Sequence, residues 1–122
     1  MSTSRRDVEF EGIFERAWKC GLAAGHTATP TAVCWAGGDT QSSEVSEGVC
    51  GYASVCIRPG TGTFARWLVR TGRGNRHCYG GVEIPINEHG QSYDRKMAHA
   101  SAVAQVLRNN LDLAVIVEGR TD

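Results

Sequence analysis

The chain has 122 residues, of which 41% are hydrophobic and 21% are charged, and its 13 basic and 13 acidic side chains balance. This composition predicts a single globular domain over residues 1–122, and the absence of net charge argues against a protein that coats DNA. No apolar run approaches the roughly 20 residues of a membrane helix, and the first residues do not resemble a secretory signal, so we expect a cytoplasmic protein with no membrane association.

The first predicted element is an amphipathic helix over residues 7–24. Apolar residues recur there at helical spacing, and the acidic first turn suits the helix dipole. Ala17, Gly21 and Gly25 repeat every four residues, so one face of the helix is small enough for close packing. Gly25 is expected to end the helix.

Two strands are predicted next, over residues 31–36 and 49–57, on either side of a polar and acidic loop. In the second strand apolar residues such as Val55 alternate with residues such as Tyr52. One face of this strand should therefore contact a core, and the other face should carry Tyr52.

The charges are concentrated in one part of the chain. Residues 1–57 carry four basic and seven acidic side chains, residues 77–122 carry four and six, and residues 58–76 carry five arginines and no acidic residue. We call residues 58–76 the arginine segment. Its letters TFARWLVRTG predict a short helix with Thr61 or Thr63 as N-cap and Gly72 at its end, with an apolar stripe on one side and arginines on the other.

The rest of the chain predicts a strand over residues 78–86, a long helix over residues 93–109 capped by Ser92, and a last strand over residues 113–117. The paired asparagines after the long helix suggest a left-handed exit. The last strand is apolar throughout, which is typical of a central strand or of one whose outer face is shielded.

These elements follow the order α-β-β-α-β-α-β. We expect an α+β fold, a two-layer sandwich in which three helices pack on one face of a mixed sheet of about four strands. The long helix would join two parallel strands, if both belong to that sheet.

The arginine segment is the strongest candidate for a binding site. Glycine and threonine at the start of a helix present backbone N–H and hydroxyl groups to an anion, and arginines hold phosphate or carboxylate groups in a bidentate manner. A solvated turn followed by an ordinary charged helix face explains the same pattern. The candidate residues for binding a protein or a phosphate group are Arg58, Gly60, Gly62, Thr63, Arg66, Arg70, Arg73 and Arg76.

A second candidate feature is a pair of tyrosines, Tyr52 and Tyr79. The strand pattern places them on neighbouring strands, on the face away from the core, where they could stack nucleic-acid bases. Tyrosines at such positions also simply cover a sheet.

Catalytic and cofactor signals are weak. Gly60, Gly62 and Ala65 match a dinucleotide-binding pattern, but Pro59 breaks the strand before it and the following helix is short. The four histidines are scattered, with His99 expected at the boundary of the core, and no nucleophile or carboxylate pair accompanies them. We therefore expect no enzyme, no cofactor and no metal.

The five cysteines include no C-x-x-C pair, so neither a disulfide framework nor a zinc site is indicated. We expect reduced and mostly buried thiols. A site built from His77, Cys78 and a distant ligand has no supporting spacing.

Three segments, FARWL at 64–68, YGGVEI at 79–84 and QSYDRKMAHASAVAQVLR at 91–108, resemble a group of small accessory proteins of tailed bacteriophages and prophages. The resemblance covers about the C-terminal two-thirds of the chain and carries over no functional residue. It implies a viral product in the bacterial cytoplasm.

Together these features favour a non-enzymatic binding protein that inhibits or modulates a host bacterial protein, such as a defence component. The alternative is a nucleic-acid, nucleotide or phosphate binder that uses the arginines, and a third possibility is a minor virion or assembly component. A homodimer is compatible with the three tryptophans and the small-residue face of the first helix.

Overall fold

The computed structural model describes residues 5–28, 50–76, 80–90 and 92–121. Within these ranges the chain forms three helices and four strands, which confirms the α+β class. The elements are α1 (Arg5–Thr27), β1 (Gly51–Arg58), α2 (Thr63–Arg70), β2 (Asn75–Arg76), β3 (Val82–Pro85), α3 (Tyr93–Asn110) and β4 (Ala114–Thr121).

The order of the elements differs from the expected order at two points. The strand expected over residues 31–36 lies outside the described residues. The two-residue strand β2 lies between the predicted short helix and the strand predicted over residues 78–86, where no element was predicted, and its Asn75 and Arg76 pair with Glu83 and Val82 of β3. A strand this short has no periodic pattern that the sequence could display.

The strands form one sheet in the order β2-β3-β1-β4, and every pair of neighbours is antiparallel. The sheet is therefore antiparallel rather than mixed. β3 and β4 run in the same direction, as expected for strands joined by α3, but β1 lies between them and pairs with both.

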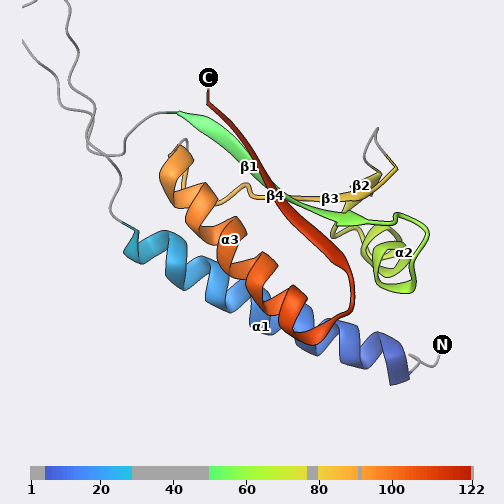
Figure 1. Ribbon diagram of the computed structural model, residues 1–122. Helices are drawn as coiled ribbons and strands as arrows, with labels where there is room; N and C mark the ends of the chain where they lie inside the picture. The colour runs from blue at the N-terminus through green and yellow to red at the C-terminus, as the bar shows by residue number, and fades with distance from the viewer. Residues whose placement is uncertain (1–4, 29–49, 77–79, 91, 122) are drawn as a thin grey trace, which may run out of the picture.

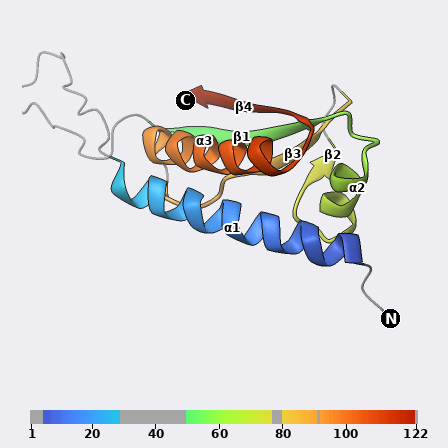
Figure 2. The ribbon, with the colours of Figure 1, turned by 60° about the horizontal axis from the view of Figure 1, so that its bottom comes forward.

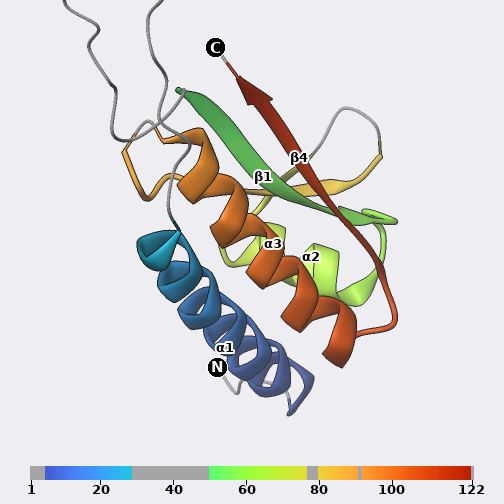
Figure 3. The same cartoon turned by 60° about the vertical axis from the view of Figure 1, so that its left-hand side comes forward.

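All three helices lie on one side of the sheet (Figure 1, Figure 2). α3 covers β1 and β4, and α2 lies against β2 and β3. α1 packs along α3, on the side of α3 that faces away from the sheet (Figure 3). The other face of the sheet carries no described helix, and we call it the open face.

The core lies between the sheet and the helices. Strand residues that point to the helices meet the apolar sides of α2 and α3, and the aromatic rings of Phe10 and Phe64, 5.1 Å apart between centroids, join α1 to α2. Large buried members of this cluster from the strands and the two helices are Val55, Ile57, Val82, Ile84, Phe64, Trp67, Leu68, Val103 and Leu107.

α3 matches its prediction closely. It begins after Ser92, whose hydroxyl oxygen accepts a hydrogen bond from the backbone N–H of Arg95 at 3.4 Å. It ends one residue later than expected, and the helix is followed by Leu111 in an extended conformation with φ −134°. The expected left-handed exit at the asparagines was therefore wrong.

The ends of α1 and α2 also differ from expectation. α1 runs past Gly25 to Thr27, so Gly25 does not end the helix and is a buried residue within it. The N-cap of α2 is Gly62, which makes no side-chain hydrogen bond, and Thr63 is the first helical residue.

No described helix is both long and apolar enough to cross a membrane.

β4 is an edge strand of the described sheet and not a central one. It is longer than expected and continues through polar residues to Thr121. Its apolar residues alternate, with Val115 buried against α3 and Ile116 41% exposed on the open face. The uniform apolar run had suggested burial on both sides, and that interpretation was wrong for Ile116.

Candidate functional site

The open face is built from alternate residues of three strands. The pairing register brings these residues into one continuous surface, because residues directly opposite each other on antiparallel strands share a face. They are Tyr52, Ser54, Cys56 and Arg58 of β1, Glu83 and Pro85 of β3, and Ile116, Glu118 and Arg120 of β4.

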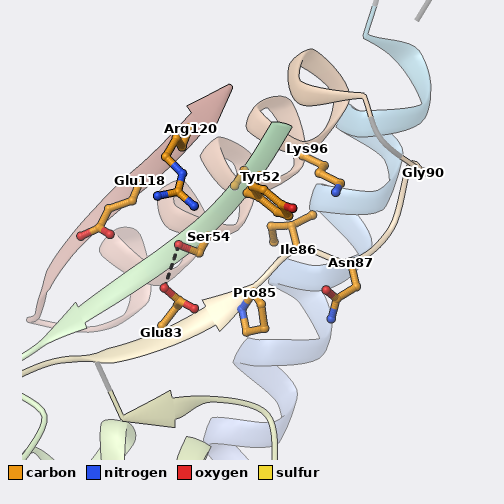
Figure 4. A pocket seen from close by; sticks show the side chains of 12 residues that line it. Tyr52, Ser54, Glu83, Pro85, Ile86, Asn87, Gly90, Lys96, Glu118 and Arg120 are labelled. Atoms are coloured by element: carbon orange, nitrogen blue, oxygen red, sulfur yellow. Dashed lines mark hydrogen bonds between the residues drawn. The ribbon is translucent and has the colours of Figure 1, made fainter. Parts of the chain in front are cut away.

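A hollow of about 740 Å³ lies at one end of the open face (Figure 4). Its walls come from β1, β3, β4, the loop after β3 and the start of α3. The polar and aromatic side chains that line it include Tyr52, Ser54, Glu83, Asn87, Lys96, Glu118 and Arg120. Ligand pockets of this size hold small organic molecules.

Tyr52 is the prominent aromatic group of this hollow, with 56% of its surface exposed. Two cations accompany its ring: the Nζ of Lys96 lies 5.6 Å from the ring centroid, and the Cζ of Arg120 lies 6.0 Å from it. Arg120 reaches this place because it is directly opposite Tyr52 in the β1–β4 pair. The exposed face expected for Tyr52 is thus confirmed.

Lys96 comes to the hollow from α3, on the other side of the sheet. β3 pairs with β1 only as far as Ser54, so the edge of β1 at Gly51 and Tyr52 is open to the lysine. The Nζ of Lys96 donates a hydrogen bond to the carbonyl oxygen of Gly51 at 3.3 Å, and the residue is only 5% exposed. The sequence did not single out Lys96, because it looks like an ordinary polar residue of a surface helix.

Carboxylates occupy the middle of the open face. Glu83 accepts a hydrogen bond from the hydroxyl of Ser54 at 3.4 Å, and Glu118 lies 4.0 Å from the guanidinium of Arg58. The face therefore has cations around Tyr52, acceptors beside them, and a further cation at the far end. Such a surface can hold a ligand with an anionic end and a hydrogen-bond-donating part.

Cys56 lies at the centre of the same face but is fully buried. Burial raises the pKa of its thiol, and the carboxylate of Glu118 raises it further, whereas Arg58 lowers it. Because the thiolate is the reactive form, Cys56 is a poor nucleophile at neutral pH.

The arginine segment makes contacts within the chain. Arg70 forms an ion pair with Asp7 at 2.8 Å, and Arg73 forms one with Glu11 at 3.5 Å. The guanidinium of Arg73 also lies 4.7 Å from the ring centroid of Trp67. Two of the candidate arginines therefore hold α2 to the acidic first half of α1.

The turn before α2 is likewise occupied by internal hydrogen bonds. The N–H of Gly60 donates to the Gly80 carbonyl at 2.9 Å, and the N–H of Gly62 donates to the Pro59 carbonyl at 3.2 Å. Arg76 donates to the carbonyl of Gly60 at 2.7 Å. The two glycine N–H groups expected to hold an anion are thus already used.

Two candidate residues of this segment are exposed. Thr63 opens α2 and is exposed. Arg66 is exposed on α2, and within the described part of the chain it has no ion-pair partner. Tyr79, the second tyrosine of the proposed stacking pair, lies outside the described residues.

Three cysteines are described, and all three are unpaired. Cys20 and Cys50 are exposed, so the expectation of mostly buried thiols was wrong for them. Across the described ranges, no group of three or more histidine, cysteine, aspartate or glutamate side chains could hold a metal ion. His77 and Cys78 lie outside those ranges.

Comparisons of this chain with protein-family models, with curated protein sequences and with solved structures gave no match. The resemblance to phage and prophage proteins therefore remains an expectation that rests on three sequence segments.

Proposed function

We propose that this chain is a non-enzymatic binding protein whose open face takes a nucleotide or a short single-stranded nucleic acid, with one base stacked on Tyr52. The observation that carries the proposal is an exposed tyrosine on an uncovered sheet face, with Lys96 and Arg120 within about 6 Å of its ring. Stacking of a base on an aromatic side chain contributes about 1–3 kcal/mol.

The cations beside Tyr52 suit the phosphate of a stacked nucleotide. The Nζ of Lys96 donates one of its three N–H groups to the carbonyl oxygen of Gly51, and among the described residues the other two have no acceptor, so a phosphate can accept from them. Arg120 is exposed and brings a guanidinium group to the same place.

The neighbouring acceptors suit the edge of the base. Carboxylates such as those of Glu83 and Glu118 accept hydrogen bonds from the amino groups of cytosine, adenine or guanine. The same carboxylates repel a long phosphate chain. A single nucleotide, or one end of a short strand, therefore fits the charge pattern better than a long polyanion does.

The proposal is tested by calorimetry with the mononucleotides and by fluorescence anisotropy with short labelled oligonucleotides. Tyr52→Phe keeps the stacking surface and should bind like wild type, whereas Tyr52→Ala should lose about 5- to 150-fold in affinity. Arg66→Ala is the matched control on a different element. Equal affinity of the Ala variant and wild type, or no binding of any member of the panel, would contradict the proposal.

The salt dependence of binding separates a nucleotide from a strand. Each phosphate contact on a single strand contributes a slope of about −0.7 to log K against log salt concentration. We expect a slope that corresponds to one or two contacts.

A host bacterial protein with an acidic surface is the second candidate ligand, and the position of Arg66 favours it. This arginine is exposed on α2, and the adjacent ion pair of Arg70 with Asp7 is itself accessible, with 61% of the Arg70 side chain exposed. Exposed ion pairs contribute only about 0–1 kcal/mol, so a partner's carboxylate can replace Asp7. With the phage resemblance, this candidate corresponds to an inhibitor of a host protein.

Affinity capture from bacterial lysate, with and without nuclease, tests this second candidate. A single nuclease-resistant protein that Arg66→Glu no longer captures would support it. Capture that is equal in the variant, or that disappears with nuclease, would argue against it.

A further inference from the structure

Three histidines from distant parts of the sequence meet between α1 and α3. They are His26 near the end of α1, His89 in the loop after β3, and His99 in the middle of α3. The Nε2 of His89 lies 2.9 Å from the Nδ1 of His99, which is a hydrogen bond between the two rings. His99 is fully buried, so its expected place at the core boundary was wrong.

The small face of α1 is shaped to receive these rings. A Cβ added at Gly21 would collide with the imidazole of His99, and one added at Gly25 would collide with that of His89. His89 itself has a left-handed backbone, with φ 71°. The glycine repeat read from the sequence therefore serves to bury a histidine pair.

The hydrogen bond between the two rings limits where their protons can lie. One nitrogen of the hydrogen bond must donate and the other must accept, so a proton on both would remove the bond. The remaining ring nitrogen of His99, Nε2, is buried and has no hydrogen-bond partner among the residues that the structure describes. A charged His99 would therefore find no acceptor where it lies.

Burial is the main cause that opposes protonation of the pair, and the charges around it act in both directions. Glu88 is the carboxylate that acts on both rings, and its oxygens already accept from the indole of Trp18 at 3.2 Å and from the backbone of Asn87 at 3.1 Å. The groups that lower the pKa of His89 through their charge are His26 from α1 and Arg95 and Lys96 from α3. Burial lowers the pKa of His89, and burial lowers the pKa of His99 to about 4.

We propose that the His89–His99 pair is an acid-sensitive latch, which holds the loop after β3 and the C-terminal half of α1 against α3 at neutral pH and releases them on acidification. The same loop contributes Asn87 and Gly90 to the hollow, so its release would also open one wall of that hollow. The latch does not depend on the proposed nucleotide; only its effect on ligand binding does.

The direction of the pH effect on the latch follows from proton linkage. In the released form both rings are in water and take up protons near the ordinary pKa of 6.5, whereas the pKa of latched His99 is about 4. Protons therefore bind the released form preferentially, and its share should rise as the pH falls from 6.5 to about 4. For His99 alone this shift corresponds to roughly a 300-fold change in the opening equilibrium.

Amide hydrogen exchange between pH 7.5 and 4.5, corrected for intrinsic exchange rates, tests the latch. In wild type, opening of residues 18–27 and 86–90 should increase by one to two orders of magnitude, while the central strand β1 stays protected. His99→Gln should remove most of the increase, because an amide can still hydrogen-bond to the Nε2 of His89 but does not titrate. His26→Gln removes an exposed ring of the same cluster as the matched control, and should reduce it less.

Two further readouts keep the test decisive. If His99→Gln does not fold, NMR titration of the wild-type rings replaces it, and ordinary titration of both rings near pH 6.5 without local opening would overturn the proposal. Equal loss of protection across the whole chain, or full pH dependence in His99→Gln, would also overturn it. Loss of nucleotide binding in acid without local opening would likewise overturn the latch, because the loss would then arise at the ligand or its binding surface.

Discussion

The arginine segment and the Tyr52 end of the open face both carry cations, but they use them differently. In the arginine segment Arg70, Arg73 and Arg76 contact carboxylates or a carbonyl of the same chain. At the Tyr52 end, Lys96 also donates to a backbone carbonyl, that of Gly51, but its ammonium group and the guanidinium of Arg120 lie close to an exposed ring at the wall of a hollow. The comparison teaches that a run of like charges does not mark a binding surface until the partners of those charges within the fold are known.

The largest effect we expect concerns the apolar side of the arginine segment. Phe64 is 1% exposed and packs against Phe10 and Trp67, so Phe64→Ala should lower the free energy of unfolding by about 3–5 kcal/mol. Chemical denaturation measures this loss. Val8→Ala, at a 58% exposed position, is the control and should change little. A small effect at Phe64 would mean that the segment is not anchored as described.

Arg76 should behave as a structural residue rather than a ligand-binding one. Its hydrogen bond to the partly buried carbonyl of Gly60 should make Arg76→Ala destabilising by about 1.5–3 kcal/mol, without a change in nucleotide affinity. Arg66→Ala should change stability by less than about 0.5 kcal/mol. If instead Arg76→Ala left stability unchanged and weakened a ligand, the contrast between the two regions would be lost.

Glu83 should set the preference among bases on the open face. Glu83→Gln keeps an acceptor for Ser54 but loses the charge, so cytidine and adenosine nucleotides should bind more weakly by about 1 kcal/mol. Uridine nucleotides, whose base lacks an amino group, should be unaffected. Calorimetry with the two classes of nucleotide measures the difference, and equal losses for both would remove Glu83 from base recognition.

The smallest effect is expected at the ion pair between α1 and α2. A double-mutant cycle on Asp7→Ala and Arg70→Ala should give a coupling of about 0.2–1 kcal/mol, because the pair is largely exposed and screened by salt. Denaturation at low and high salt checks this value. A coupling well above this range would show that the arginine segment serves mainly to stabilise the fold and not to form a binding surface.

Local features of the fold could be predicted from the sequence. The long helix with its Ser92 cap, the small face of α1 and the exposure of Tyr52 follow from periodicity and capping chemistry, which act over a few residues. The direction shared by β3 and β4 also follows from the helix that joins them.

The features that the sequence did not reveal depend on distant residues. β1 lies between β3 and β4 through pairing that no local pattern encodes. Asp7 is 63 positions from Arg70 in the sequence. The rings of His89 and His99 fit against α1 because its glycines at these positions have no side chain that would collide with them. Lys96 reaches the hollow because β3 ends early, and this too depends on the assembled sheet.

The most direct test of the account is an NMR titration of the labelled protein with a cytidine mononucleotide, in which the backbone amide shifts are mapped onto the chain. We predict that the shifts cluster at Tyr52, Glu83, Asn87 and Arg120 and leave the arginine segment unchanged. Shifts confined to residues 58–76, or no shifts at saturating nucleotide, would contradict the assignment of the open face as the binding surface.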